Sequence, residues 1–142
     1  MNNRLIVHGL MKINDKYLLI KRTEFKRGEK NMFPLYWDIP GGLVEKNELP
    51  REALIRECNE EVGLNVTINK IIHEASNIDL NKDCVYTRLV YLCDVINQSE
   101  KDIVLQLEEH SEYKLIENLK TLENELIAPF VREILEMKKY KK

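Results

Sequence analysis

The chain has few of the features that stabilise small secreted proteins or hold proteins in membranes. Its 142 residues include three cysteines, an odd number without a closely spaced pair, so a disulfide framework is not expected. Cys58, Cys84 and Cys93 lie in stretches that read as helix or strand interior, which predicts reduced, buried thiols. No apolar run approaches the roughly 18 residues of a membrane-spanning helix, and the N-terminus shows no apolar region of a signal peptide. We therefore expect a cytoplasmic protein without a membrane partner.

An excess of charge of one sign is also missing. The sequence has 22 basic and 24 acidic residues and a formal net charge of -2. A basic surface for duplex nucleic acid or anionic lipid is therefore not expected, and a small soluble ligand is the better prediction. The length suits one domain with a substantial core, so we expect a single domain over residues 1–142.

Apolar periodicity predicts strands on both sides of a central helix. Residues 23–36 break this periodicity and read as a loop, and the polar segment 77–83 reads as a turn. An apolar helical stripe runs from Leu126 toward the C-terminus, and Pro129 marks its start or a kink. Such an order favours a mixed sheet with helices on its faces. The expected strands are 5–13, 16–21, 37–39, 66–75, 85–95 and 113–116.

Residues 42–64, which read GLVEKNELPREALIRECNEEVGL, are the most informative stretch of the chain. Pro50 suits the first turn of a helix, and Glu48 just before it favours the positive end of the helix dipole. Gly63 supplies a helix stop. These signals predict a helix over residues 49–62.

Three carboxylates of this helix are spaced so that they leave one face together. Glu57, Glu60 and Glu61 stand at i, i+3 and i+4, and like charges at this spacing repel one another without a cation. Compact hard oxygen donors suit Mg²⁺ or Mn²⁺, while a solvated acidic face is the alternative reading. The opposite, apolar row is expected to pack against the core; it consists of Leu54, Cys58 and Val62.

The glycines that precede the helix complete a recognisable pattern. Pro40-Gly41-Gly42 allows the backbone to approach a ligand closely, because glycine has no side chain to obstruct it. Gly42, then five residues, Glu48, seven residues and the run 56–64 (RECNEEVGL) resemble the signature of the Nudix hydrolase family at every fixed position. Cys58 stands where the family usually has a larger aliphatic residue. The resemblance implies an α/β/α sandwich in which this signature forms a loop, a helix and a loop.

The resemblance also implies a reaction and a set of ligands. Members hydrolyse a nucleoside diphosphate linked to another group, with Mg²⁺ or Mn²⁺ neutralising charge on the phosphate oxygens. By position, Glu57, Glu60 and Glu61 would be metal ligands together with the Gly41 carbonyl. Glu57 is in addition a candidate to act on the attacking water.

Supporting residues are expected inside and outside the signature. The planar guanidinium of Arg56 is expected to orient Glu48 through paired hydrogen bonds, the alternative being a surface arginine. Family members often place a base or a further ligand on a late loop. Glu109 is the first candidate for that position and Glu112 the second.

Substrate contacts are sought near the end of the second strand. Arg22 is expected near phosphate or base, and Trp37 is expected either to stack on a base or to fill the core. His8 and His73 lie in strand patterns, where a structural histidine is expected. His110 is expected to be exposed.

The sequence leaves several substrates open. Asp79 occupies the position of the proline expected of ADP-ribose pyrophosphatases, and the tyrosine of diadenosine-polyphosphate hydrolases is absent near Asn81. Elimination favours a MutT-like nucleoside triphosphate diphosphatase, with oxidised nucleotides among its candidate substrates. An ADP-ribose or ADP-sugar pyrophosphatase is the alternative enzyme. A non-catalytic nucleotide-sensing module is the alternative of another class, although sensing alone does not require all three carboxylates. A homodimer, and closure of the loop 23–36 over a ligand, stay open.

Overall fold

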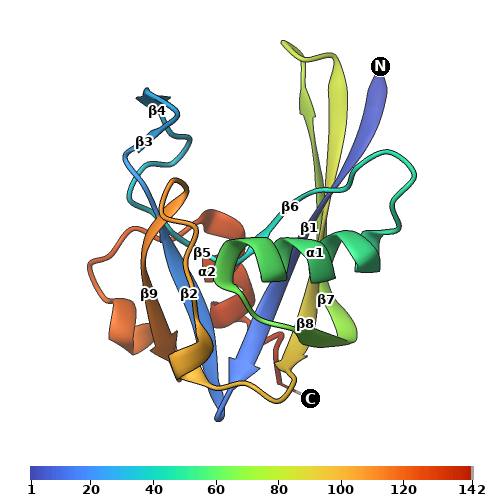
Figure 1. Cartoon of the computed structure of the whole chain (residues 1–142). Coiled ribbons are helices and arrows are strands. Elements are labelled where there is room, and N and C mark those ends of the chain that lie inside the picture. Colours follow the sequence, from blue (N-terminus) through green and yellow to red (C-terminus); the bar gives the residue numbers. More distant parts are fainter. Residues whose placement is uncertain (142) are drawn as a thin grey trace.

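The alternating apolar segments of the chain pair into one mixed β-sheet. The computed structural model describes residues 1–141, and its main sheet has seven strands in the order β5-β2-β1-β8-β7, with β6 added to β1 and β9 added to β2 (Figure 1). β1 and β8 run parallel, and the other pairs are antiparallel. The strands are β1 (Asn2–Ile13), β2 (Lys16–Arg22), β5 (Trp37–Asp38), β6 (Gly41–Leu43), β7 (Val66–Asp79), β8 (Cys84–Val95) and β9 (His110–Ile116).

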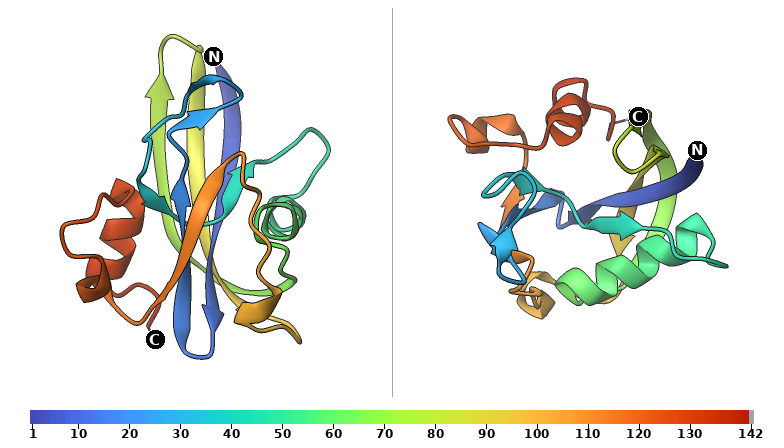
Figure 2. Two further views of the ribbon diagram at one scale, coloured as in Figure 1. Left: turned by 60° about the vertical axis from the view of Figure 1, so that its left-hand side comes forward. Right: turned by 90° about the horizontal axis from the view of Figure 1, so that it is seen from above.

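One α-helix covers each face of the sheet, as Figure 2 shows. Helix α1 (Pro50–Val62) packs on one face and helix α2 (Pro129–Glu136) on the other. The core therefore has two halves, one on each side of the sheet. This arrangement confirms the predicted α/β/α sandwich. The helix residues in these halves are Ala53, Leu54, Cys58 and Val62 from α1, and Val131, Ile134 and Leu135 from α2.

Local signals set the ends of both helices. Pro50 occupies the first turn of α1, and Gly63 ends the helix with φ 70°, a left-handed conformation that favours glycine. The Gly63 N–H donates to the Asn59 carbonyl at 2.9 Å. Helix α2 begins at Pro129, so the proline marks a start and not a kink.

The hairpin of β7 and β8 is longer than predicted. The segment 77–83 was expected to be a turn, but pairing continues to Asp79 and Cys84. Polar side chains are compatible with this exposed part of the sheet, because they bond to one another across the strands; the Ser76 and Thr87 hydroxyls lie 2.9 Å apart.

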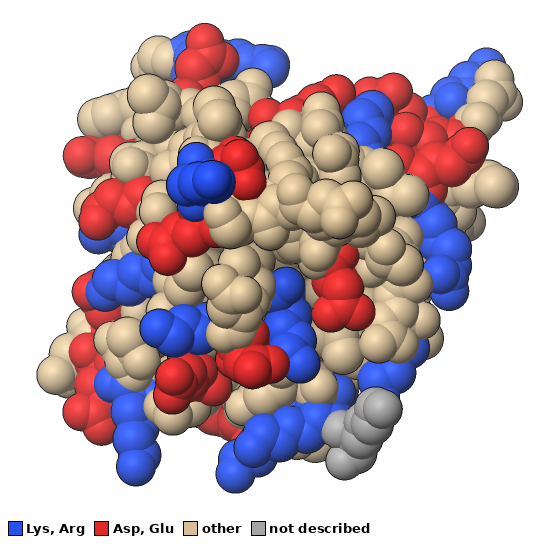
Figure 3. Space-filling model, turned by 60° about the horizontal axis from the view of Figure 1, so that its bottom comes forward, with Lys and Arg blue, Asp and Glu red and all other residues tan. Residues whose placement is uncertain are grey.

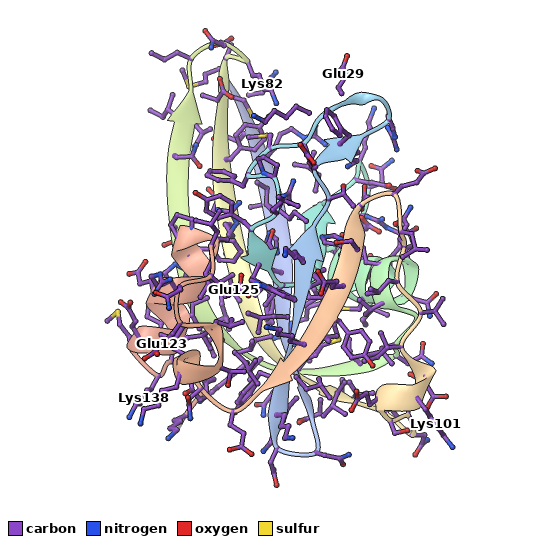
Figure 4. The ribbon with its side chains drawn as sticks, turned by 90° about the vertical axis from the view of Figure 1, so that its left-hand side faces the viewer. Glu29, Lys82, Lys101, Glu123, Glu125 and Lys138 are labelled. Carbon is purple, nitrogen blue, oxygen red and sulfur yellow. The ribbon has the colours of Figure 1, made fainter. Side chains whose placement is uncertain are left out.

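The expected loop 23–36 contains a small hairpin of its own, and the two hairpins project from the same end of the molecule. β3 (Phe25–Lys26) pairs with β4 (Glu29–Lys30). Glu29 and Lys82 mark the two projections in Figure 4. The projections frame the region described below.

Buried thiols and mixed surface charge agree with the sequence. All three cysteines are free and buried, as predicted. Acidic and basic side chains are interspersed on the face drawn in Figure 3. Among the described residues, no helix has the length and apolar character of a membrane span.

The packing of α1 can be tested with neighbouring residues of that helix. Leu54 is 0% exposed and Ile55 is 45% exposed. Leu54→Ala is expected to lower the free energy of unfolding by about 2–5 kcal/mol, because it leaves a cavity between helix and sheet. Ile55→Ala, the matched control, is expected to change it by less than about 1 kcal/mol. Urea denaturation measures both, and equal losses would contradict the placement of α1.

Candidate active site

A cleft of about 900 Å³ lies beside α1 and between the two projecting hairpins. Its walls come from β1, the segment 22–33, β6, α1, β7, β8, the residues before β9 and the start of α2. Acidic, basic and aromatic side chains all reach it. The charged side chains that the argument below uses are Arg22, Asp38, Glu57, Glu61, Arg88 and Glu109.

Two glycines allow β6 to lie close to both β1 and α1. A Cβ at Gly41 would clash with the backbone oxygen of Val7, and a Cβ at Gly42 would lie 2.6 Å from a Glu57 carboxylate oxygen. Neither glycine has a positive φ. Close approach is therefore the reason for glycine here, as the sequence suggested. It brings the Gly41 N–H within 2.7 Å of Glu61 Oε2.

Glu61 is a carboxyl group that solvent cannot stabilise. It is 4% exposed, and burial raises its pKa to about 9, against the effect of the Gly41 N–H, which lowers it. Burial also raises the pKa of the half-buried Glu57, although Arg56 opposes this shift. A bound cation favours the ionised forms of both groups. The pair therefore fits a divalent cation by charge and by oxygen chemistry.

Glu60 does not join this pair. Its side chain is 54% exposed and pairs with Arg56 at 3.2 Å, and it does not line the cleft. Glu60 does leave α1 on the side of Glu57, since Arg56 Nη1 donates to both carboxylates at 3.0 and 3.2 Å, but it is more exposed than Glu57 and Glu61. On the sheet, α1 places Glu61 inward and Glu57 at the cleft wall, while Glu60 is largely in solvent. A role for Glu60 in holding metal stays a prediction.

The residues before β9 close the other side of the site. The Gln106 N–H donates to the Glu61 carbonyl at 2.9 Å, which fixes this segment to the end of α1. As a result, single donor atoms of Glu61, Glu109 and His110 all lie within 4.8 Å of one another, a group that could hold a metal ion. Glu112, the second candidate of the sequence, is exposed and pairs with Lys21 instead.

His110 is buried, which corrects the expectation that it is exposed. It is 5% exposed, and burial lowers its pKa to about 4. Its Nδ1 is buried without a hydrogen-bond partner within residues 1–141. A neutral imidazole with a free nitrogen is a suitable metal ligand. No signal in the sequence distinguished it from an exposed loop histidine.

Glu109 is held in its charged form by a lysine from the opposite hairpin. Lys26 Nζ lies 2.6 Å from Glu109 Oε1. Burial alone would raise the pKa of Glu109, but the hydrogen bond and charge of Lys26 outweigh it and the pKa is lowered. The loop 23–36 is thereby tied to the site.

Arg56 makes the predicted paired hydrogen bonds. Its Nε and Nη2 donate to the two Glu48 oxygens at 2.8 and 3.0 Å. These bonds lower the pKa of Glu48 to about 2. Nη1 of the same guanidinium donates to Glu57 Oε1 at 3.0 Å. Arg56 and Glu48 together thus orient Glu57 at the cleft.

Arg22 lines the cleft, but its donors are committed to the protein. They reach Met32 O at 2.7 Å, Asn31 Oδ1 at 3.0 Å and Asp38 Oδ2 at 3.2 Å. These bonds hold the segment 31–38 in place. A direct contact of Arg22 with substrate stays a prediction.

Trp37 fills the core, the second of the two alternatives considered for it. The side chain is 1% exposed and packs with the residues of α2. It does not line the cleft, so stacking of Trp37 on a base is not supported. His8 and His73 are both 7% exposed within strands, as expected of structural histidines, although both reach the cleft wall.

Arg88 and Phe130 also line the cleft and were not recognised in the sequence. Arg88 lies over the Phe130 ring, with Cζ 4.3 Å from the ring centroid. A signal for Arg88 exists, since it is the one charged residue in the run Val85–Cys93 of a strand rich in β-branched and aromatic residues. Phe130 was read only as part of an apolar helical stripe.

Comparison with known proteins agrees with this fold. The structure is similar to that of the MutT protein from Methanosarcina mazei Go1, with a TM-score of 0.74 and 24% identity over 99% of this chain and 97% of that one. The family model described as NUDIX domain matches residues 3–137. The chain therefore belongs to the NUDIX domain family.

Two of the relatives, which carry different names, illustrate the range of similarity. The chain is 30% identical over 121 residues to the nucleoside triphosphatase NudI of Escherichia coli O81 (strain ED1a), which covers 80% of this chain and 81% of that protein. It is 33% identical over 90 residues to the ADP-ribose pyrophosphatase of Methanocaldococcus jannaschii, which covers 63% of this chain. The match spans only 50% of the length of that archaeal relative.

The burial of Glu61 predicts a pH-dependent stability of the metal-free protein. The unfolded chain loses this proton near the ordinary pKa of 4.5, whereas the folded protein keeps it to about pH 9. The folded state therefore binds more protons across this window, and stability falls as pH rises through it.

In a chelating buffer at pH 8, Glu61→Gln is expected to raise the free energy of unfolding by on the order of 2 kcal/mol. The glutamine oxygen can still accept the Gly41 N–H. The gain should disappear at pH 4.5, and the exposed Glu60→Gln, one position away, should show no such dependence. Chemical denaturation at both pH values measures this, and a loss of stability at pH 8 would contradict the assignment.

Proposed function

We propose that the protein is a hydrolase that requires Mg²⁺ or Mn²⁺ and cleaves nucleoside triphosphates to a monophosphate and pyrophosphate. The observation that carries this proposal is the grouping of buried Glu61 with Glu57 and Glu109 at one cleft. The similarity to the nucleoside triphosphatase NudI over 80% of the chain supports the substrate class. We further propose a cytoplasmic location, and we leave a homodimer as the alternative to a monomer.

The residues of the site divide the work of such a reaction. A divalent cation held by Glu61, Glu109 and His110, with Glu57, Glu60 and the Gly41 carbonyl as further ligands, would neutralise phosphate oxygens and lower the pKa of a bound water. Glu57, with its raised pKa, accepts a proton from the attacking water. The Gly41 N–H holds the Glu61 carboxyl in place.

Arg56 keeps Glu57 in position for this task. Its guanidinium is fixed by both oxygens of Glu48, so the third contact, to Glu57, has a defined direction. Positioning and electrostatic stabilisation supply most of the catalysis in phosphoryl transfer. Arg56 and Glu48 are therefore proposed as positioning residues.

An ADP-ribose or ADP-sugar pyrophosphatase is the second candidate. The similarity to the archaeal ADP-ribose pyrophosphatase favours it, but that match covers half of the relative, and Asp79 replaces the proline expected of that activity. A non-catalytic sensor would not need a base, yet Glu57 is oriented by Arg56 in the cleft. We therefore favour catalysis.

Product analysis distinguishes these candidates. The protein is incubated with nucleoside triphosphates, ADP-ribose and dinucleoside polyphosphates, with Mg²⁺ or Mn²⁺, and the products are separated. A monophosphate and pyrophosphate are expected. AMP and ribose phosphate as the main products would overturn the preferred substrate, and tight binding without hydrolysis would favour the sensor.

Glu57→Gln is expected to lower kcat by at least about 100-fold, because the glutamine cannot accept a proton. Glu123→Gln is the control, since Glu123 is exposed and does not line the cleft. In Figure 4 it lies toward the opposite end of the molecule from Glu29. Steady-state kinetics and circular dichroism of both variants make the comparison. Near-normal turnover of folded Glu57→Gln would remove Glu57 from the reaction.

A further inference from the structure

Arg88 is a cleft arginine whose donors the protein leaves free. Its Nε is buried and has no hydrogen-bond partner within residues 1–141. In that part of the chain Arg88 also forms no ion pair. Arg22 and Arg56 each bind carboxylates. Arg4 also lines the cleft without an ion pair in the described part of the chain, but only Arg88 has a buried guanidinium nitrogen without a hydrogen-bond partner there. The buried Nε is out of reach of a ligand, but the two Nη groups are not fully buried and also have no acceptor within residues 1–141. A partly buried guanidinium without acceptors is costly, so a ligand in the cleft would stabilise it by accepting from the Nη groups.

Phe130 lies against this guanidinium. Arg88 Cζ lies 4.3 Å from the ring centroid, and the His8 ring packs against the same phenylalanine at 4.8 Å. Stacking uses the flat face of the guanidinium and leaves the N–H groups at its edge free. The contact with the ring therefore restricts the directions in which the donors of Arg88 can point.

The surroundings of Arg88 suit a flat, neutral ring better than a phosphate. Ile6 of β1 and Ala75 of β7 are its register partners on the two neighbouring strands, and both line the cleft. They give the cleft an apolar floor on either side of the guanidinium. The phosphates of the proposed substrate belong at the carboxylate group, where a cation can neutralise them. The base is the remaining part of the nucleotide.

Asp38 forms no ion pair with Arg88 within the described residues. The charge of Asp38 acts on Arg88, but its two oxygens accept from Arg22 and from the Ile39 N–H. The planar donors of Arg88 are thus available to a pair of adjacent acceptors. The O6 and N7 atoms of guanine form such a pair, whereas adenine presents a donor at N6.

We propose that Arg88, held flat by Phe130, reads the base of the substrate and selects guanine over adenine. This inference rests on the proposed function, since it names the base of the nucleoside triphosphate that the site would hydrolyse. Arg88 donates to O6 and N7, and Phe130 acts as a positioning residue for the guanidinium.

Steady-state kinetics with GTP, 7-deaza-GTP and ATP test the role of Arg88. The wild-type protein is expected to prefer GTP over ATP in kcat/KM, and Arg88→Ala to reduce this preference about 10- to 100-fold. Arg88→Lys keeps the positive charge but loses the paired planar donors of the guanidinium. The preference for GTP should therefore also fall in this variant. 7-Deaza-GTP lacks the N7 acceptor. The fall in kcat/KM from GTP to 7-deaza-GTP should therefore be larger for the wild-type protein than for the Arg88→Ala variant.

The matched control is Arg51→Ala. Arg51 also lies over an aromatic ring, that of Tyr91 at 5.3 Å, but it is outside the cleft. Its removal should leave the base preference unchanged. An equal loss for GTP and ATP in Arg88→Ala would show a phosphate contact and overturn the proposal, as would a wild-type protein without preference for guanine.

Binding of GMP and AMP by calorimetry separates this inference from the proposed function. Tighter binding of GMP than of AMP, lost in Arg88→Ala, supports the inference even if no triphosphate is hydrolysed. Hydrolysis of triphosphates with an Arg88-independent preference overturns the inference and leaves the proposed function intact.

Phe130 is tested by two variants. Phe130→Leu removes the aromatic ring and should lower the preference for guanine. Phe130→Tyr keeps the ring and should retain the preference of the wild-type protein. A purely structural role would reduce thermal stability without changing the ratio of the two substrates, and that result would remove Phe130 from base selection.

Discussion

The hydrogen bond between the Gly41 N–H and the buried carboxyl of Glu61 is the interaction on which the rest of the site depends. It requires β6 to lie against α1, which in turn requires glycine at positions 41 and 42 because a Cβ would meet Val7 or Glu57. The end of α1 then anchors the segment that carries Glu109. A carboxyl that is buried at this junction has its pKa raised to about 9, so its ionised form needs a cation. The packing that buries Glu61 is thus also the reason why the site favours a metal ion.

The arginines of the cleft region differ in function because they differ in acceptors. Arg56 is saturated by carboxylates and orients one of them. Arg22 binds Asn31, a carbonyl and Asp38, and so holds a loop. Arg88 has a ring beneath it and a buried Nε without a partner within residues 1–141. The role of each arginine therefore depends on its neighbours. Arg56 positions a carboxylate, Arg22 holds a loop in place, and Arg88 is a candidate contact for a ligand.

Much of the fold could be predicted because its signals are local. Pro50 and Gly63 set the ends of α1 through backbone geometry that neighbouring residues determine, and the alternating pattern located the long strands. The extent of β7 was missed, because continued pairing with β8 to Asp79 depends on the partner strand and not on the polar residues of β7 itself. The position of Trp37 was left open for a similar reason, since an aromatic ring suits both a core and a base.

The sequence alone determined the spacing of the acidic residues, the Arg56–Glu48 pair and the glycines, because these act over one helix and its flanking turns. Tertiary structure decided which carboxylates face the cleft. Glu57 and Glu61 do, whereas Glu60 is 54% exposed. His110 is buried beside Glu61 because the segment before β9 is anchored to the end of α1. Packing likewise decided which arginines have hydrogen-bond acceptors within the protein. The acceptors of Arg22 lie in the segment 31–38, whereas Arg88 meets the ring of Phe130 from the C-terminal helix. Burial and pairing are properties of the assembled layers, and no local pattern encodes them.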